Sequence, residues 1–252
     1  MDSSNDNLTS LTAFCSTAAL GTYLARKHAN HSSHAHHYDK SLAGLHRSYQ
    51  VVFILGGPGA GKGTQCERLV AESSSSSSSS LDLNIWTHLS AGDLLREERL
   101  NSKSSLANII NERIAAGKIV PAEITTRLIK NAMDDAYEKT KCSRFLIDGF
   151  PRSEGNVRCW EETMDSCSVV EFVLFLDCPE DIMTGRLLER GLTSGRSDDQ
   201  SLDVIRTRFE TFRNESMPIV DMYEGQGKVK RVIADRSIDD VFEEVVALFR
   251  GL

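Results

Sequence analysis

Residues 56–64 read GGPGAGKGT and directly follow the apolar run Val51-Val52-Phe53-Ile54-Leu55. A short, continuous apolar run predicts a strand that is buried on both faces of a sheet. The glycines let backbone N–H groups turn inward around phosphate oxygens, and a helix that begins near Gly61 adds its partial positive charge. Lys62 completes the pattern G-x-x-x-x-G-K, in which the lysine reaches the terminal phosphates. The stretch therefore predicts a binding site for a nucleoside triphosphate.

The rest of the chain from residue 50 onward alternates apolar runs with helical patterns. Further strands are predicted near residues 85–88, 144–147, 169–177 and 229–234. Helices are predicted over residues 61–72, 92–100, 104–116, 122–138, 179–190, 201–223 and 237–250. Strands that alternate with helices indicate an α/β fold, in which helices cover both faces of a parallel sheet. Ligands of such folds bind beyond the carboxyl ends of the strands, which is where the unusual residues of this chain lie.

Composition limits the classes of partner. With 252 residues, the chain can form one large α/β domain or two small ones. Its net charge of −7 argues against a surface that coats nucleic acid, so no nucleic-acid partner is expected. No apolar stretch reaches the length that crosses a bilayer, so no membrane partner is expected either. Six cysteines without a CxxC pair are typical of reduced thiols, which favours a cytoplasmic or nuclear protein.

Two segments differ in composition from the rest of the chain. Residues 1–48 are rich in Ser, Thr, Ala and His, which is typical either of a disordered extension or of an organelle-targeting segment. The His-rich stretch HANHSSHAHH within it is not assigned a metal. Residues 73–80 are all serine, which predicts a loop insertion that buries nothing. The folded domain is therefore expected to span residues 49–252.

Several arginines lie at the ends of predicted elements or among glycines. They occur in HLSAGDLLREE (88–98), DGFPR (148–152), ERGLTSGRSDD (189–199) and on the next helix: Arg96, Arg152, Arg190, Arg196, Arg206 and Arg208. Phosphoryl transfer between two nucleotides brings many negative oxygens together, and guanidinium groups, one lysine and Mg²⁺ neutralise them. Gly191 and Gly195 bracket a short segment that is expected to swing, closing arginines over the reactants and excluding water.

The motifs GGPGAGKGTQ, LSAGDLLR, GKIVP, DGFPR and SGRSDD, in this order, resemble those of the adenylate kinase superfamily of nucleoside-monophosphate kinases, with the short lid. The resemblance covers roughly residues 50–250. It implies a P-loop NTPase fold with a five-stranded parallel sheet, a mobile monophosphate-binding segment at about 90–120 and a lid at about 190–200. It also implies a monomer that uses ATP with Mg²⁺ to phosphorylate a nucleoside monophosphate reversibly.

The same resemblance implies roles for individual residues. The ATP-binding residues would be Gly57, Gly59, Ala60, Gly61, Lys62, Gly63, Thr64 and Arg190. The monophosphate-binding residues would be Ser90, Ala91, Arg96, Lys118, Ile119, Val120, Gly149, Phe150, Pro151, Arg152, Asn156, Arg196 and Arg208. The catalytic set would be Lys62, Arg152, Arg190, Arg196 and Arg208. Asp148, at a strand end, would orient Mg²⁺ through water, whereas the alternative interpretation of this carboxylate is a turn or helix cap.

One position departs from the spacing that is usual in the superfamily. Arg206 and Arg208 lie one residue short of the usual distance from Arg196 and one residue beyond it. Arg208 begins the stretch RFETF, which fits the superfamily better than the stretch at Arg206 does. Arg208 is therefore predicted to be the arginine that acts beside Arg190 and Arg196.

Ala91 and Asn156 bear on the base of the acceptor nucleotide. Superfamily members that phosphorylate AMP generally carry threonine and glutamine there, whereas Ala91, Asn156 and the later Trp160 resemble the members that phosphorylate UMP and CMP. A carboxamide has one acceptor and two donors, and it is expected to turn over to suit cytosine or uracil. CMP and UMP are therefore the predicted acceptors, with dCMP left open. The alternative interpretation is that Asn156 caps a helix, in competition with Ser153.

Two other functions stay open on the sequence. The first is an adenylate kinase that acts on AMP. The second, from another class, is a non-catalytic nucleotide-binding module, and the presence of Lys62 together with all the arginines argues against it.

Overall fold

The computed structural model of the chain describes residues 48–74, 85–194, 196–199, 201–250 and 252. The predicted N-terminal extension lies outside the described residues apart from Ser48, and so do residues 75–80 of the serine run and Gly195. The strands of the described residues are β1 (Tyr49–Gly56), β2 (Thr87–Ser90), β3 (Arg144–Asp148), β4 (Ser168–Asp177) and β5 (Val229–Ile233).

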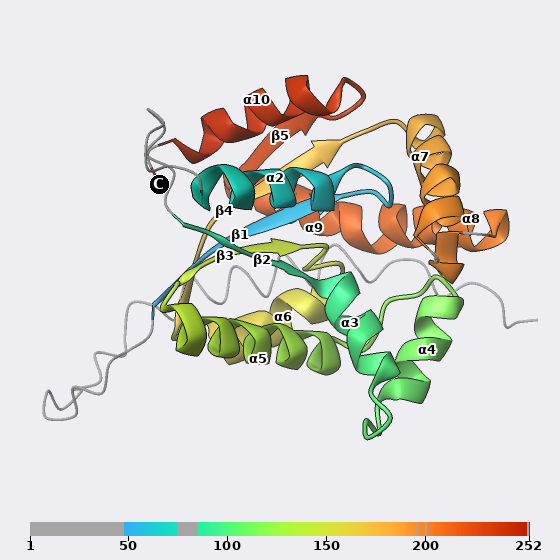
Figure 1. The fold of residues 1–252 in the computed structure, drawn as a ribbon, viewed down its shortest axis with the longest axis horizontal. Helices are drawn as coiled ribbons and strands as arrows, with labels where there is room; N and C mark the ends of the chain where they lie inside the picture. Colours follow the sequence, from blue (N-terminus) through green and yellow to red (C-terminus); the bar gives the residue numbers. More distant parts are fainter. Residues whose placement is uncertain (1–47, 75–84, 195, 200, 251) are drawn as a thin grey trace, which may run out of the picture. The chain divides into compact units, whose positions relative to one another are not determined.

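The five strands form a parallel sheet in the order β2-β3-β1-β4-β5, which confirms the predicted five-stranded parallel sheet (Figure 1). The strand order reverses at β1, because β3 lies on one side of it and β4 on the other. Asp148 of β3 is in register with Ile54 of β1 and with Ser90 of β2. The carboxyl ends of these three strands therefore meet where a ligand of such a sheet binds.

Helices cover both faces of the sheet, as predicted. Val52 and Ile54 point to one face and Phe53 and Leu55 to the other, because successive strand residues alternate. The helices on the first face are α2 (Lys62–Ser74), α7 (Glu180–Thr193), α8 (Leu202–Thr211) and α10 (Ile238–Phe249). Those on the second face are α5 (Ala122–Thr140), α6 (Glu154–Met164) and α9 (Met217–Gly225). Figure 1 shows α2 and α10 above the sheet and α5 and α6 below it.

The segment predicted to bind the monophosphate contains α3 (Ala91–Leu100) and α4 (Ala107–Ala115). The side chain of Ser90 caps α3, because its Oγ accepts a hydrogen bond from the backbone N–H of Asp93 at 3.3 Å. Ile110, Val120 and Ile124 form a small apolar cluster that is separate from the two clusters on the sheet. This segment thus packs around a core of its own.

Some predicted boundaries are wrong. β2 begins at Thr87 rather than near Ile85, whose side chain is exposed. Helix α4 is shorter at its start than the predicted 104–116, and α6 was not among the predicted helices. Gly191 does not open a loop, because it lies inside α7, where a Cβ would come within 2.7 Å of the carbonyl oxygen of Asp199. Gly191 therefore permits close packing of the lid on α7, and the swing of the segment that begins at this glycine stays a prediction.

The helix predicted over 201–223 is interrupted. A π-helical segment, Phe212–Ser216, separates α8 from α9. Pro218 lies in the first turn of α9 and has no backbone N–H, so the α-helical hydrogen bond to the residue four positions earlier cannot form. The chain changes its helical hydrogen-bonding pattern just before this proline.

The serine run is not a loop throughout. Ser73 and Ser74 are the last residues of α2. The side chain of Ser73 is buried, and its Oγ donates a hydrogen bond to the carbonyl oxygen of Val70 at 2.9 Å. The prediction that the run buries nothing is therefore wrong at Ser73.

Three further findings bear on the predicted class of protein. No helix in the described part of the chain combines the length and the apolar character that a bilayer-crossing segment needs. The five cysteines among the described residues are free thiols. Over the same residues, no group of three or more His, Cys, Asp or Glu side chains is arranged to hold a metal ion.

Candidate active site

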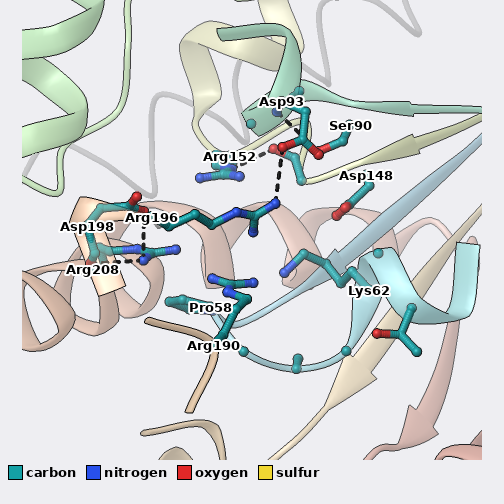
Figure 2. A pocket seen from close by; sticks show the side chains of 18 of the residues that line it. Pro58, Lys62, Ser90, Asp93, Asp148, Arg152, Arg190, Arg196, Asp198 and Arg208 are labelled. Atoms are coloured by element: carbon teal, nitrogen blue, oxygen red, sulfur yellow. Dashed lines mark hydrogen bonds and ion pairs between the residues drawn. The ribbon is translucent and has the colours of Figure 1, made fainter. Parts of the chain in front are cut away.

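A cavity of about 580 Å³ opens at the carboxyl ends of the strands. Its wall comes from the phosphate loop (residues 56–64), the start of α3, residues 117–120, the turn after β3, the end of α7 with the lid, α8 and the turn before α10. Figure 2 shows basic side chains from several of these elements converging on one space. The labelled ones are Lys62, Arg152, Arg190, Arg196 and Arg208.

The phosphate loop is held by its own backbone. Gly59 has a φ angle of +87°, and a Cβ there would lie 2.7 Å from the carbonyl oxygen of Met183, so only glycine fits. The Nζ atom of Lys62 donates hydrogen bonds to the carbonyl oxygens of Gly56 and Gly57, at 3.0 and 2.9 Å. The lysine is thus positioned by the loop that it belongs to.

The surroundings of Lys62 lower its pKa to about 8. Burial is the largest cause, because it disfavours the charged ammonium. The carboxylate of Asp148 opposes this effect, and the guanidinium groups of neighbouring arginines add to it. Any phosphate that enters the cavity favours the protonated lysine.

Asp148 stands at the end of β3, opposite the phosphate loop. The Nε2 atom of His88 lies 3.8 Å from its Oδ2, which is longer than a hydrogen bond. Burial alone would raise the pKa of Asp148, but the proximity of His88 and Lys62 outweighs burial and the pKa is lowered. A Cβ on Gly63 would lie 3.8 Å from the same Oδ2, so the carboxylate faces the first turn of α2. Asp148 therefore stays ionised beside the phosphate loop.

Two arginines of the cavity share one carboxylate. Arg96, on α3, forms an ion pair with Asp93 one turn earlier. Arg196, in the lid, reaches across the cavity and places its Nη2 3.1 Å from Oδ1 of the same aspartate (Figure 2). Asp93 is half-exposed and has a lowered pKa, because these hydrogen bonds and charges outweigh its partial burial. Asp93 thus joins the monophosphate-binding segment to the lid.

Two other arginines share a buried carboxylate. Asp199 is 0% exposed, and its Oδ2 accepts a hydrogen bond from Nε of Arg190 at 2.7 Å. Its Oδ1 accepts one from Nη1 of Arg208 at 2.5 Å, and Asp198 pairs with the same guanidinium at 2.9 Å. Burial would raise the pKa of Asp199, but the two arginines outweigh it and lower the pKa. This aspartate fixes Arg190 and Arg208 relative to each other.

Arg206 and Arg208 lie on different sides of α8. Arg208 lines the cavity and lies on the same side of the helix as the buried residues Ile205 and Phe209. Arg206 is 73% exposed and pairs with the exposed Asp203 at 3.4 Å. The geometry thus puts Arg208, and not Arg206, beside Arg190 and Arg196.

Arg152 is positioned by the turn that carries it. Its Nε donates a hydrogen bond to the carbonyl oxygen of Gly149 at 2.5 Å. Its own backbone N–H donates to Oδ1 of Asn156 at 3.0 Å, and its carbonyl oxygen accepts from Oγ of Ser216 at 3.0 Å. Burial and the nearby charge of Arg208 lower the pKa of this guanidinium, so the site is strongly receptive to negative charge.

Asn156 lies in the first turn of α6 and is 2% exposed. It does not cap the helix, because Oγ of Ser153 occupies the cap and accepts from the backbone N–H of Asn156 at 3.3 Å. The predicted turnover of its amide is also wrong, because the N–H of Arg152 fixes Oδ1 on one side. Nδ2 has no hydrogen-bond partner among the described residues. Asn156 therefore offers the cavity a donor in one fixed orientation.

Most of the predicted residues line the cavity. They are Gly59, Ala60, Gly61, Lys62, Gly63, Thr64, Ser90, Ala91, Arg96, Lys118, Ile119, Val120, Asp148, Gly149, Arg152, Asn156, Arg190, Arg196 and Arg208.

Three predicted residues are not part of the cavity wall. The carbonyl oxygen of Gly57 accepts from Lys62 behind the loop. The side chain of Phe150 is fully buried against Phe53 and Trp160, so it does not reach the cavity, and a role of this residue toward the monophosphate stays a prediction. Pro151 lines a second, smaller cavity of about 80 Å³ behind Arg152.

Other cavity residues were not predicted. One end of the cavity is walled by Gln65, Arg186, Ala234, Arg236 and Ile238. Nη1 of Arg186 donates to the carbonyl oxygen of Ala234 at 3.0 Å. The residues after β5 could have been predicted from the sequence, because the turn that follows a parallel strand lies at the same end of the sheet as the phosphate loop. His88, Asp93 and Asp198 were passed over because acidic and imidazole groups beside a phosphate site have no evident role until the arginines are placed.

The cavity can neutralise and align several phosphate groups. Among the described residues, two lysines and seven arginines line it, and aspartates hold four of these arginines in place: Arg96, Arg190, Arg196 and Arg208. Such an array suits transfer of a phosphoryl group, in which positioning and charge neutralisation supply most of the catalysis.

Comparisons with known proteins agree with this arrangement. Residues 54–228 match the family model described as Adenylate kinase. The UMP-CMP kinase of Gallus gallus is 50% identical over 200 residues, which cover 79% of this chain and 96% of that protein. The UMP-CMP kinase of Homo sapiens is 48% identical over 200 residues, with the same coverage. The Uridylate kinase of Saccharomyces cerevisiae is 49% identical over 197 residues, which cover 77% of this chain and 88% of that protein.

Proposed function

Since this chain belongs to the adenylate kinase family, we propose that it transfers the γ-phosphoryl group of ATP reversibly to the pyrimidine monophosphates UMP and CMP. The reaction class, phosphorylation of a nucleoside monophosphate, is that of its relatives. The observation that carries the choice of acceptor is the fixed amide of Asn156 in the wall of the cavity.

The phosphate loop receives ATP. The N–H groups at its turn and the first turn of α2 bind the β- and γ-phosphates, and Lys62 exchanges its loop carbonyls for phosphate oxygens. The end of the cavity walled by Arg186, Arg236 and Ile238 lies beside this loop and receives the adenosine.

The opposite side of the cavity receives the monophosphate. Arg96 and Arg152 bind its phosphate, since both guanidinium groups face the cavity from the acceptor side. Lys118, Ile119 and Val120 line the space for its base and ribose. Ser90 and Ala91 close this space at the start of α3.

Arg190, Arg196 and Arg208 surround the transferred group. Asp199 holds Arg190 and Arg208, so these two guanidinium groups are oriented before the nucleotides arrive. Arg196 is held by the half-exposed Asp93 and turns to the phosphates when they displace this carboxylate. Neutralisation of the three equatorial oxygens lowers the barrier to transfer.

Asp148 fits a role toward Mg²⁺. Its carboxylate is ionised, buried and directed at the first turn of α2, and a carboxylate oxygen is a ligand that Mg²⁺ or its bound water prefers. Mg²⁺ held here with ATP would neutralise part of the charge of the phosphates. His88, behind Asp148, helps keep the carboxylate oriented.

The amide of Asn156 serves both pyrimidines through one donor. A bidentate amide reads a donor and an acceptor side by side, which adenine and cytosine both present. Here Oδ1 is committed to the backbone of Arg152, so only the Nδ2 donor is free for the base. Uracil O4 and cytosine N3 are both acceptors, so a single fixed donor serves UMP and CMP without turning over.

Kinetics with alternative acceptors test this proposal. With ATP and Mg²⁺, we expect kcat/KM for UMP and CMP to exceed that for AMP by roughly 10–100-fold, since an unpaired polar group costs about 1–3 kcal/mol. The same panel with dCMP reports on the ribose. A clear preference for AMP contradicts the proposal, and binding of ATP without any formation of CDP or UDP favours the non-catalytic module.

A substitution at Asn156 isolates the amide. Asn156→Asp keeps an acceptor for the N–H of Arg152 but removes the Nδ2 donor, so activity with UMP and CMP should fall at least tenfold. Asn131→Asp, the same change on the exposed face of α5, is the matched control and should leave both activities unchanged. Equal losses in the two variants would contradict the role of Asn156.

The remaining expectations concern the whole chain. We propose that the protein acts as a monomer in the cytoplasm, without nucleic acid or membrane as partner. Comparing the cellular location of the full chain with that of a chain that starts at Ser48 tests whether residues 1–48 direct import. If the shorter chain is found in another compartment than the full chain, residues 1–48 are a targeting segment and not merely a disordered extension.

A further inference from the structure

The helix that carries Arg208 changes its hydrogen-bonding pattern beyond this residue. The backbone N–H of Met217 donates to the carbonyl oxygen of Phe212, five residues earlier, and this closes the π-helical segment Phe212–Ser216. π-Helical turns are rare and frequently occur at functional sites. This one lies against the second cavity, which Arg152 and Arg208 also line.

Two hydroxyl groups at the ends of this segment hold backbone carbonyls of the acceptor side. Oγ of Ser216 donates to the carbonyl oxygen of Arg152 at 3.0 Å. Oγ1 of Thr211, the residue just before the segment, donates to the carbonyl oxygen of Gly117 at 3.2 Å. The first carbonyl belongs to the turn after β3, and the second precedes the residues assigned to the base and ribose.

The π-turn explains how one helix reaches both places. In a uniform α-helix, Arg208 and Ser216 would point about 80° apart, because eight residues make two turns and a remainder. A π-turn contains more residues per turn, which reduces this difference. Arg208 and Ser216 accordingly line the same small cavity, of about 80 Å³.

The peptide group of Arg152 is fixed on both sides. Asn156 Oδ1 accepts from its N–H, and Ser216 Oγ donates to its carbonyl oxygen. The side chain is held in addition by the carbonyl oxygen of Gly149. Ser216 itself is 6% exposed, so its hydroxyl has no competing contact with bulk water. Without this hydroxyl, the carbonyl oxygen of Arg152 would lose its partner on that side.

We propose that Ser216 is a positioning residue of the transfer reaction, which acts by holding Arg152 in place for the phosphate of the acceptor nucleotide. The hydroxyl of Thr211 acts in the same way, and more weakly, on the loop at Gly117. This inference rests on the proposed function, because it assumes that Arg152 binds the monophosphate. It predicts that loss of the Ser216 hydroxyl weakens binding of the acceptor nucleotide but not binding of ATP.

The test compares two serine hydroxyls that make the same kind of hydrogen bond. In Ser216→Ala, we expect KM and the dissociation constant for UMP to rise about threefold to tenfold, the range that a lost hydrogen bond produces. KM for ATP should change less than twofold. Ser216→Thr keeps the hydroxyl and should restore most of the affinity for UMP. Thr211→Val, which keeps the shape but removes the donor, should raise KM for UMP by a smaller factor.

Ser168→Ala is the matched control. Oγ of Ser168 donates to the carbonyl oxygen of Met164 at 2.9 Å, and Ser168 begins β4, at the end of the sheet away from the cavity. This variant should lose thermal stability as Ser216→Ala does, but bind UMP like the parent protein. Titration calorimetry with UMP and thermal unfolding measure both quantities without turnover.

The outcomes separate the two proposals. Parent-like binding of UMP by Ser216→Ala, with a loss of stability like that of Ser168→Ala, shows a merely structural serine and overturns the inference. Equal weakening of UMP and ATP binding overturns it as well, because the effect is then not confined to Arg152. If the parent protein makes neither UDP nor CDP, the proposed function fails instead, and this is seen in the parent before any variant is assayed.

Discussion

The phosphate loop and the arginine cluster both receive phosphate groups, but they are built in opposite ways. The loop is one contiguous stretch, and Lys62 is held by the carbonyl oxygens of Gly56 and Gly57 within it. The arginines come from α3, the turn after β3, α7, the lid and α8. Aspartates hold those of α3, α7, the lid and α8, and only Arg152 is held by the backbone of its own turn. The loop is thus a local structure and the cluster is a product of the whole fold.

This difference has a consequence for substitutions. In the loop, the hydrogen bonds of the Lys62 side chain go to its sequence neighbours Gly56 and Gly57, so a change at this lysine breaks no hydrogen bond to a distant element. In the cluster, one carboxylate holds two guanidinium groups, so a single change disturbs elements that are far apart in the chain. Buried like charges at close range are stable only with such counter-charges or with a bound anion.

The largest effect is expected at Lys62. Lys62→Met removes the charge that stabilises the transferred group, and kcat/KM should fall by about 10²–10³, as for loss of one preorganised donor. Lys139→Met, at an exposed position of α5, is the control and should be as active as the parent. Steady-state kinetics with ATP and UMP measure both. An activity of Lys62→Met within tenfold of the parent would mean that the loop does not hold the reacting phosphate.

A somewhat smaller effect is expected at Asp199. Asp199→Asn keeps the shape but removes the negative charge between Arg190 and Arg208, so kcat/KM should fall about 10–100-fold and the free energy of unfolding by about 3–5 kcal/mol. Because the pKa of Asp199 is lowered in the folded state, its contribution is present at neutral pH and is lost as the pH falls through that pKa.

Urea unfolding and kinetics report on the two consequences of this substitution. Asp203→Asn, which removes the exposed partner of Arg206 on the same helix, is the matched control and should change neither quantity. If Asp199→Asn loses stability but keeps its activity, Arg190 and Arg208 do not need the carboxylate of Asp199 to be oriented for the reaction.

A few-fold effect of opposite sign is expected at Asp93. This carboxylate is half-exposed and competes with the nucleotide phosphates for Arg96 and Arg196. Asp93→Asn should therefore bind UMP about threefold tighter, because solvent screens such pairs and their strength is modest. Titration calorimetry measures it, with Asp135→Asn on α5 as the control. Weaker binding would show instead that Asp93 orients the arginines for the substrate.

The smallest expected effect is that Lys62 takes up less than one proton when ATP binds. The pKa of Lys62 is about 8 in the free protein, where it faces Asp148, Arg152, Arg190 and Arg208, and phosphates raise this pKa. Above pH 8 the free lysine is mostly neutral, so ATP binding takes up a proton and weakens as the pH rises. Calorimetry at pH 8.5 in two buffers of different ionisation enthalpy measures the uptake, which Lys62→Met should abolish. No uptake by the parent protein contradicts the lowered pKa.

The local character of the loop also made it predictable from the sequence. The apolar run of β1, the glycines and Lys62 act through neighbours, and the observed helix begins within one residue of the predicted start. The strand ends at Ser90, Ile54 and Asp148 lie together because of a rule about parallel strands, and no individual contact was needed to predict this. Arg208 could be chosen over Arg206, and the burial of Ile205 and Phe209 gives the physical reason.

Features that depend on contacts between distant residues were not predicted. The amide of Asn156 is oriented by a backbone N–H in a turn whose conformation the sequence does not specify. Apolar residues recur at helical spacing through 201–223, and this conceals the π-turn although Pro218 marks the place. In the sequence, Asp198 and Asp199 are only part of the motif SGRSDD. Their role could not be predicted, because it depends on which guanidinium groups they contact in the fold.

Asp93 competes with the nucleotide phosphates for two arginines of the site. A small anion that offers one or two oxygens must displace this carboxylate from Arg96 and Arg196 and gains little in exchange. A pair of nucleotides offers many oxygens on one rigid frame, so the exchange becomes favourable through the chelate effect. When the diphosphate products leave, the same carboxylate is at hand to take back the arginines, which shortens the residence time of the products. We therefore expect this acidic group to disfavour small anions at the two arginines and to favour release of the products.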